Sequence, residues 1–230
     1  MSISEGGEAR AMSKINSFSE ALGQGLAQAL VEATIKTLGD LFIGLGKSAV
    51  DAVRDLHLQP QMGSLFADRL NGTAGNDLIS AGWGNDTVRG GAGTDIIDGG
   101  KGDDVLNGGA GSDILTGGSG RDRFTFALAD LGAGDRDILI DIGKGERVDF
   151  DAAAETVLRI NGTALSSLTA DTALPTFLQA GVTNIAQING HIVIDLNNDG
   201  RYDAEQDHTI IIPDGLSVRY DAAADWFVIA

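Results

Sequence analysis

A nine-residue period runs from residue 72 to residue 125 and constrains the fold more than any other feature of the sequence. The six units are GTAGNDLIS, AGWGNDTVR, GGAGTDIID, GGKGDDVLN, GGAGSDILT and GGSGRDRFT. In every unit the fourth residue is glycine, the sixth is aspartate and the eighth is apolar. A flexible glycine-rich linker would not keep an aspartate and an apolar residue in fixed phase. The period therefore predicts an ordered stack of repeats.

Each unit combines a glycine turn with a short strand. Glycine adopts positive φ without steric cost, so the G-G-x-G stretch can form a tight turn. The three residues around the eighth position predict a strand whose apolar side chain points inward. If one coil takes two units, six units predict three coils, which at about 4.8 Å per strand stack to roughly 15 Å. Turn carbonyls that find no backbone partner can be satisfied by a cation.

The units match the pattern G-G-x-G-x-D-x-U-x, and residues 72–125 resemble the RTX (repeats-in-toxin) calcium-binding proteins. The resemblance implies calcium ions between the turns of units two apart, held by aspartate carboxylates and turn carbonyls. The implied aspartate pairs, which allow up to four sites, are Asp77 with Asp95, Asp86 with Asp104, Asp95 with Asp113, and Asp104 with Asp122. The implied carbonyl ligands belong to Gly91, Gly93, Gly100, Gly102, Gly109 and Gly111.

The array lacks the apolar side chains to fold unaided. Burying one apolar residue per unit falls well short of the entropy cost of ordering 54 residues, many of them glycine. Without a metal the aspartates also repel one another. We therefore expect the array to be disordered in calcium-poor cytosol and to fold on calcium outside the cell.

Charge and composition agree with a cation-binding role. The formal net charge is −17, and residues 1–60 contribute −2 of it through seven acidic and five basic residues, which leaves −15 for residues 61–230. So acidic a chain is unsuited to nucleic acid, which needs Lys and Arg, and suited to hard cations that take oxygen ligands. Cysteine is absent, which excludes disulfides and thiolate metal sites.

Residues 126–230 predict a β-rich C-terminal cap. The stretch 121–150 resembles the cap that follows RTX arrays in serralysin-type proteases and alginate epimerase modules, through Phe124, Phe126 and the segment DILIDIGKGERVDF. Alternating apolar residues predict strands in this segment that cover the open end of the roll. Further strands are predicted at 156–160, 191–196, 209–212 and 216–220.

The last residues, YDAAADWFVIA, resemble the C-terminal signals of proteins exported by type I (ABC transporter) systems. This resemblance implies secretion through such a transporter and would account for a start without a signal-peptide pattern. Residues 226–229 can equally be a last core strand.

A second calcium loop is predicted within DLNNDGRYDAEQD, residues 195–207. Asp195, Asn197 and Asp199 occupy positions 1, 3 and 5 of an EF-hand-like loop, with Gly200 at the turn. Position 12 holds Gln206, and the next acid is one residue beyond. The candidate ligands are Asp195, Asn197, Asp199, Arg201, Asp203 and Asp207. A solvated acidic turn between two strands is the alternative.

Residues 14–60 predict an amphipathic helix or helical hairpin between a flexible tail, 1–13, and a linker, 61–71. Apolar residues from Phe18 to Leu56 recur at an average spacing of about 3.7. A stripe of small residues at spacing four would let two helices approach closely. The segment can pack on itself or on the rest of the chain, self-associate, or meet a cell surface. Contact with anionic lipid gains little, because no face is basic.

We find no catalytic motif: H-E-x-x-H, G-x-S-x-G and cysteine nucleophiles are all missing. The predicted fold is mainly β, a parallel β-roll of six nonapeptide repeats with a β-rich cap and an N-terminal helical region. The predicted function is that of a secreted, non-enzymatic calcium-binding protein with a structural, surface-association or protein-interaction role. The alternatives are a membrane-active, bacteriocin-like toxin that acts through the N-terminal helix, and an accessory module for a polysaccharide-acting enzyme.

Overall fold

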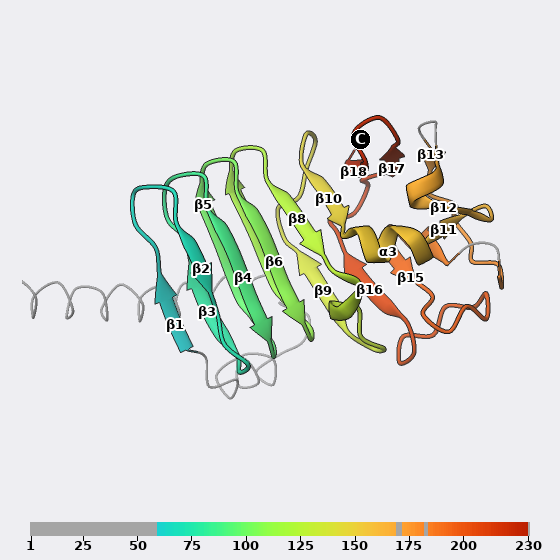
Figure 1. Ribbon diagram of the computed structural model, residues 1–230, viewed down its shortest axis with the longest axis horizontal. Helices are drawn as coiled ribbons and strands as arrows, with labels where there is room; N and C mark the ends of the chain where they lie inside the picture. The colour runs from blue at the N-terminus through green and yellow to red at the C-terminus, as the bar shows by residue number, and fades with distance from the viewer. Residues whose placement is uncertain (1–58, 169–171, 182–183, 230) are drawn as a thin grey trace, which may run out of the picture.

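The computed structural model describes residues 59–229 except 169–171 and 182–183. The predicted tail and nearly all of the predicted helical region therefore lie outside the described residues. The prediction of a mainly β fold is confirmed in the described part of the chain, where two parallel sheets form a roll that leads into a β-rich cap (Figure 1).

Successive strands of the roll alternate between the two sheets, because each glycine turn reverses the chain. Sheet A contains β1 (Gln59–Met62), β3 (Asp77–Ser80), β5 (Ile96–Lys101), β7 (Ile114–Ser119) and β9 (Arg136–Leu139). Sheet B contains β2 (Arg69–Asn71), β4 (Thr87–Ala92), β6 (Val105–Ala110), β8 (Arg123–Phe126) and β10 (Arg147–Phe150).

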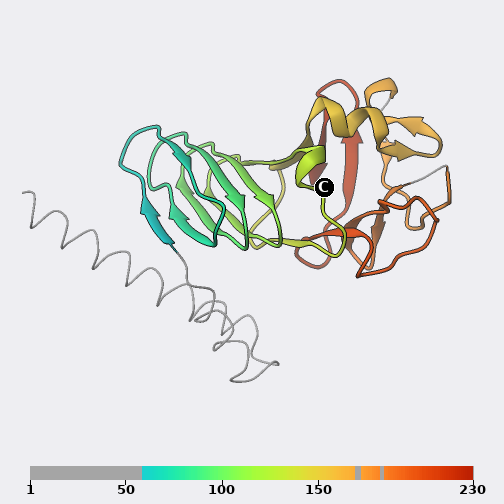
Figure 2. The ribbon, with the colours of Figure 1, turned by 60° about the horizontal axis from the view of Figure 1, so that its bottom comes forward.

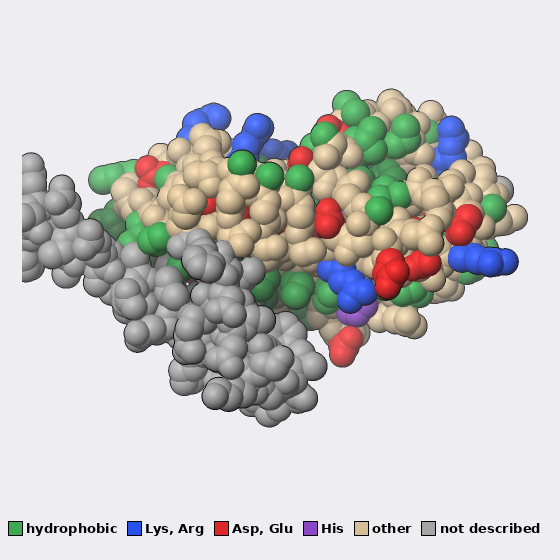
Figure 3. Space-filling view, turned by 90° about the horizontal axis from the view of Figure 1, so that it is seen from below, with side chains coloured by type: hydrophobic (Ala, Val, Ile, Leu, Met, Phe, Trp, Pro, Cys, Tyr) green, Lys and Arg blue, Asp and Glu red, His purple; other side chains and the backbone are tan. Residues whose placement is uncertain are grey.

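The eighth residue of every unit points into the roll. Ile79, Ile97 and Leu115 are in register across sheet A, and the corresponding residues of sheet B are likewise aligned. All six inward side chains are fully buried: Ile79, Val88, Ile97, Leu106, Leu115 and Phe124. One aliphatic or aromatic side chain in nine thus forms the core of the roll, joined only by Ala81 from another position of the units. Backbone and small polar residues, drawn in tan, make up much of the face seen in Figure 3.

Residues 61–71 are not a linker but part of the roll. Gln59 of β1 pairs with Asp77, and Arg69 of β2 pairs with Thr87, both in parallel register. Residues 63–71, GSLFADRLN, keep the nine-residue phase, with Asp68 at the sixth place and Leu70 at the eighth, although the glycine pattern is lost. The roll therefore has one more coil before the three that the glycine pattern predicts.

The cap extends both sheets. β9 pairs with β7 and β10 pairs with β8, each in parallel register, so the chain after the repeats completes a further coil. Sheet A then continues through β16 (His208–Ile211), β15 (His191–Ile194) and β14 (Ile185–Ile188). Sheet B continues through β18 (Trp226–Ile229), β17 (Val218–Asp221) and β13 (Thr172–Ala173). Because both sheets continue into the cap, the last strands of the roll have no unpaired edge at this end (Figure 2).

The remaining elements of the cap are short: α3 (Ala152–Val157), the 3₁₀ helices η1 (Leu128–Asp130) and η2 (Leu165–Ser167), and a hairpin of β11 (Arg159–Ile160) and β12 (Thr163–Ala164). The predicted strand 156–160 is wrong in its first half, where α3 ends. Asp151 caps that helix by accepting a hydrogen bond from the Ala154 N–H at 2.8 Å, which favours helix over strand at this point.

Residues 226–229 form β18, a core strand between β17 and β10. Phe227 and Ile229 are buried, and the Phe227 ring lies 5.6 Å from the Phe150 ring centroid in an edge-to-face arrangement. The aromatic residues of the cap thus hold the end of the chain against the end of the roll.

The turns require glycine where successive coils approach most closely. Gly111, the fourth residue of its unit, has φ of +120°, and a Cβ there would lie 2.0 Å from the Gly93 carbonyl oxygen. Gly75 holds the same place in the first unit, yet a Cβ there would meet only side-chain atoms at ordinary contact distance, Gln59 Nε2 at 3.4 Å and Thr73 Oγ1 at 3.7 Å.

We expect Gly111→Ala to lower the free energy of unfolding of the calcium-saturated protein by about 1–3 kcal/mol, because it combines backbone strain with a carbonyl clash. Gly75→Ala is the matched control and should be neutral or slightly stabilising. Urea unfolding followed by circular dichroism measures both changes. Equal effects of the two substitutions would contradict this account of the turns.

Candidate metal centres

The repeat aspartates form two buried rows, one along each line of turns. In sheet A, Asp77 begins β3, and Asp95 and Asp113 directly precede β5 and β7. In sheet B, Asp86, Asp104 and Asp122 directly precede β4, β6 and β8. All six are at most 1% exposed. The predicted aspartate partners are thus neighbours, stacked one coil apart.

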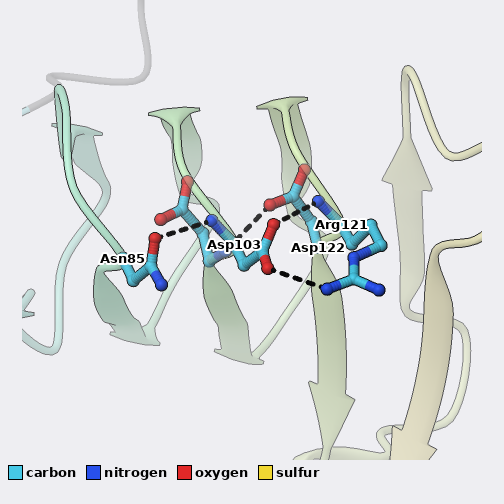
Figure 4. A network of polar contacts seen from close by, with 5 residues as sticks. Asn85, Asp103, Arg121 and Asp122 are labelled. Atoms are coloured by element: carbon cyan, nitrogen blue, oxygen red, sulfur yellow. Dashed lines mark hydrogen bonds and ion pairs between the residues drawn. The ribbon is translucent and has the colours of Figure 1, made fainter.

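Within each row, one carboxylate oxygen binds the backbone of the preceding coil. The Asp77 N–H donates to Asp95 Oδ1 at 2.8 Å, and the Asp95 N–H donates to Asp113 Oδ1 at 2.8 Å. In the other row the Asp86 N–H donates to Asp104 Oδ1 at 2.7 Å. The Asp104 N–H donates to Asp122 Oδ1 at 2.9 Å (Figure 4). These bonds fix the spacing of the coils and the direction of every carboxylate.

The second carboxylate oxygen has no hydrogen-bond partner in five of these residues. Oδ2 is buried and unpartnered in Asp86, Asp95, Asp104, Asp113 and Asp122. In units three to six the first residue is glycine, which makes room for this oxygen: a Cβ on Gly90 or Gly108 would lie 2.2 Å from Oδ2 of Asp95 or Asp113. An unpartnered buried carboxylate oxygen is costly, so each row requires a cation or a proton.

The raised pKa values of the repeat aspartates also show that each row favours a neutralising partner. Burial raises the pKa of Asp95 and of Asp104 to about 6, with the neighbouring aspartates adding to the shift and the backbone hydrogen bond opposing it. Burial raises the pKa of Asp113 further, to about 8, with Asp137 and Asp95 adding to the shift and the backbone hydrogen bond opposing it. Without a metal, the rows hold protons at pH values where exposed aspartates are fully ionised.

Glycine carbonyl oxygens lie between successive turns. A Cβ on Gly109 would lie 2.0 Å from the Gly91 carbonyl oxygen, and one on Gly102 would lie 1.8 Å from that of Gly84. Carbonyls of one turn therefore point at the same turn of the next coil, beside the carboxylates. The described residues contain no group of three or more His, Asp or Glu side chains placed to hold a metal. The carboxylate and carbonyl oxygens of the rows are the ligand type that Ca²⁺ takes.

Comparison with known families agrees with this chemistry. The family described as RTX calcium-binding nonapeptide repeat (4 copies) matches residues 62–97 and 89–124. This part of the chain is an RTX array. RTX repeats bind Ca²⁺, so the predicted resemblance and the predicted cofactor are confirmed at this level.

Two solved structures are similar to the chain. The AlgE6R2 subunit of the Azotobacter vinelandii mannuronan C5-epimerase is 24% identical, with 73% of this chain and 88% of that chain covered and a TM-score of 0.28. The AlgE6R3 subunit of the same enzyme is 23% identical, with 67% and 76% covered and a TM-score of 0.23. Both TM-scores are low. A search of curated proteins gave no significant match.

The first unit of the RTX array differs from the later ones. Thr73 stands where later units have their second glycine, and both its N–H and its hydroxyl donate to Asp77 Oδ2, at 2.6 and 2.9 Å. The unpartnered oxygen of Asp77 is Oδ1 instead. In this unit, Thr73 therefore supplies hydrogen bonds to the carboxylate oxygen that has no partner in the later units.

The rows are longer than the repeats predict. Asp86 Oδ1 accepts from the Asp68 N–H at 2.7 Å, and the Asp113 N–H donates to Asp137 Oδ1 at 2.9 Å. Asp68 is in phase with the repeats and could have been found by extending the period backwards. Asp137 could not, because the turn before β9 is six residues longer than a repeat turn and breaks the phase.

The rows end on side chains of the cap. Asp137 Oδ2 lies 3.0 Å from His208 Nε2 on β16, and both residues are fully buried. In the other row Asp122 interacts with Glu146, whose pKa burial raises to about 7, with Asp141 and Asp122 adding to the shift and the Gly143 N–H opposing it. The cap thus takes over the place of a further repeat.

The fifth residues of the units form a second ladder of hydrogen bonds, which is exposed and which no sequence motif predicts. The Asp103 N–H donates to Asn85 Oδ1 at 3.0 Å, and the Arg121 N–H donates to Asp103 Oδ1 at 2.9 Å (Figure 4). Arg121 Nη2 also lies 3.4 Å from Asp103 Oδ2. Asparagine and aspartate serve equally as acceptors in this ladder.

The loop 195–207 brings two of its predicted ligands into the interior. Asp195 and Asp207 are fully buried, whereas Asn197, Asp199 and Arg201 are exposed. Asp195 accepts from the N–H groups of Asp199 and Gly200 at 3.2 and 2.8 Å. Asp203 accepts from the Glu205 N–H at 2.9 Å, and its own N–H donates to Asp207 Oδ2 at 2.7 Å.

One oxygen in this loop is left open. Asp207 Oδ1 is buried without a hydrogen-bond partner, and burial, reinforced by the charges of Asp195 and Asp199, raises the pKa of Asp207. The calcium prediction for this loop stays a prediction.

The raised pKa values predict how the metal-free RTX array responds to pH. A carboxyl whose folded pKa lies above its ordinary value stabilises the fold at low pH, and that stabilisation is lost as pH rises through the folded pKa. In chelator, the strand signal should therefore be strongest at or below about pH 4, the ordinary pKa of aspartate, and should fall as pH rises above it. It should weaken as Asp95 and Asp104 ionise at about 6 and Asp113 at about 8.

Circular dichroism in chelator across this range measures the trend. In saturating calcium the dependence should vanish or reverse, because the ion replaces the protons. A strand signal in chelator that grows with pH would contradict the assignment.

Proposed function

We propose that this chain is a secreted, non-enzymatic calcium-binding protein whose roll folds when it meets calcium outside the cell. The observation that carries the proposal is the set of five buried aspartates, each with one oxygen lacking a partner. In low calcium, the roll must hold these charges buried or protonate them, and either costs stability. In high calcium the same oxygens become ligands.

The proposed sites lie between turns two units apart. The aspartate pairs are Asp77 with Asp95, Asp95 with Asp113, Asp86 with Asp104, and Asp104 with Asp122. Carbonyls of Gly91, Gly93, Gly100, Gly102, Gly109 and Gly111 complete them. When bound, calcium supplies positive charge to the rows and a bridge between coils. The chain's contribution is to fix the carboxylates at one-coil spacing through the backbone hydrogen bonds.

Export through a type I ABC transporter is part of the proposal and is supported by the resemblance of the last residues to such signals. Phe227 and Ile229 are buried in β18 in the folded protein. A transporter could therefore bind this segment only while the cap is unfolded. Calcium-poor cytosol favours that unfolded state. No helix among the described residues is long and apolar enough to cross a membrane.

The working role that we propose is structural: surface association or protein interaction by a calcium-rigidified roll. The membrane-active alternative depends on residues 17–57, which lie outside the described residues. Nothing in the described part of the chain favours that alternative or the polysaccharide-module alternative.

We expect Asp104→Asn to raise the calcium concentration at the midpoint of folding roughly tenfold, because Asp104 belongs to two of the proposed sites. Asparagine keeps the acceptor for the Asp86 N–H and removes the charge. Asp103→Asn is the matched control: it is the adjacent residue, loses the same charge, and takes the side chain that Asn85 already has in the exposed ladder.

Circular dichroism during a calcium titration measures the midpoint for both variants. The proposal fails if the strand signal is already complete in chelator at neutral pH, or if the two variants shift the midpoint equally.

For the second loop, we propose that Asp195, Asn197, Asp199, Asp203, Asp207 and the backbone of Arg201 hold one further calcium ion. The double substitution Asp195→Ala with Asp199→Ala should then lower the number of bound calcium ions by one and leave the folding midpoint of the roll nearly unchanged. Equilibrium dialysis counts the ions. An unchanged count with a folded cap would remove this site and leave the roll sites untouched.

A further inference from the structure

The two outer faces of the roll differ in a way that the calcium sites do not explain. The seventh residue of each unit points outward, because the eighth points inward and strand side chains alternate. On sheet B these outward residues are Thr87, Val105 and Arg123, in register with one another. On sheet A they are Leu78, Ile96 and Ile114, continued by Ile138 of β9. We call these four residues the outer row of sheet A.

Two members of the outer row are buried although they face outward. Leu78 is 2% exposed and Ile96 is 4% exposed. Their counterparts Thr87 and Val105 on sheet B are only half-buried, as are Ile114 and Ile138 farther along the same row. Neighbours within a sheet therefore leave part of a side chain at this position exposed, and the nearly complete burial of Leu78 and Ile96 points to a further layer on top of the sheet.

The size of the buried area fits one helix. Neighbouring parallel strands lie about 4.8 Å apart, and an α-helix with its side chains is about 10 Å wide. A single helix along the strands thus covers two of them, which here are β3 and β5. Neither Leu78 nor Ile96 belongs to the apolar clusters formed within the described part of the chain.

We propose that residues 17–57 of this chain dock their apolar stripe on the outer row of sheet A, over Leu78 and Ile96. The segment has the required chemistry, since Phe18, Leu22, Leu26 and Leu30 recur at helical spacing with charged and amide residues opposite. The segment is also connected directly to sheet A. Residue 58 leads directly into β1, the edge strand of sheet A, where Pro60 pairs with Leu78 of the outer row.

A covalent connection beside the docking face makes this segment a stronger occupant than a second copy. The tether gives the segment a high effective concentration at the face, whereas a second chain must pay for lost translational freedom. Docking needs only the folded roll. If calcium folds the roll, a step that rests on the proposed function, then calcium also creates the face that retains the segment.

The absence of cysteine allows a clean accessibility test in the full chain and in saturating calcium. We expect a cysteine in Ile96→Cys to react with a maleimide at least about tenfold more slowly than one in Val105→Cys, its counterpart on sheet B. Adding Leu26→Glu with Leu30→Glu should abolish this protection. Gln24→Glu with Gln28→Glu, which adds the same charge to the polar side of the segment, should leave it intact.

Three outcomes would overturn the proposal: equal rates for the two cysteines, protection that survives Leu26→Glu with Leu30→Glu, or protection that disappears on dilution, which would assign the cover to a second copy. The far-UV strand signal in calcium reports whether the roll is folded in each variant, and so separates this proposal from calcium-dependent folding.

A reciprocal measurement applies if the segment variant does not fold. Ile96→Glu should accelerate hydrogen exchange throughout residues 17–57, whereas Val105→Glu should not. Unchanged exchange in the segment of the Ile96→Glu chain would overturn the proposal as well.

Discussion

The backbone hydrogen bond from each repeat aspartate to the carboxylate one coil later is the interaction on which the rest of the roll depends. It holds the coils in register, sets the direction of the carboxylates, and leaves their second oxygens buried without a partner. An apolar core of one side chain in nine cannot hold such a stack of charges by itself. Stability therefore depends on what neutralises the second oxygen, and the RTX array is a fold with its main electrostatic partner outside the chain.

The cap replaces a further glycine turn at the end of each row. His208 stands beside Asp137, and Glu146 stands beside Asp122, so each last carboxylate faces a side chain and not another glycine turn. The cap also extends both sheets by hydrogen bonding, which protects their edges. A single structural unit thus terminates the charge ladder and the backbone ladder together.

The repeat array could be predicted from sequence because glycine, aspartate and an apolar residue recur at a fixed spacing, and each has one physical task. The early coil was missed because residues 63–71 keep only Asp68 and Leu70 of that pattern. Asp137 was missed because a longer turn shifts it out of phase, although its carboxylate continues the row. Strand 156–160 was assigned from apolar content, whereas the Asp151 cap starts a helix there. Local sequence patterns do not identify such long-range partners. In the loop 195–207, likewise, the burial of Asp195 and Asp207 is visible only in the folded structure.

The alternation of apolar and polar outer faces has a consequence for how such an array can change in length. Odd and even units differ at the seventh position, so the true period of the surface is eighteen residues even though the turns repeat every nine. Inserting or deleting one unit would keep every glycine turn and every aspartate, yet it would exchange the faces of all later strands. Leu78 and Ile114 would then no longer share a sheet. Growth or shrinkage by whole coils preserves both faces, so the pair of units, not the nonapeptide, is the structural building block of the roll.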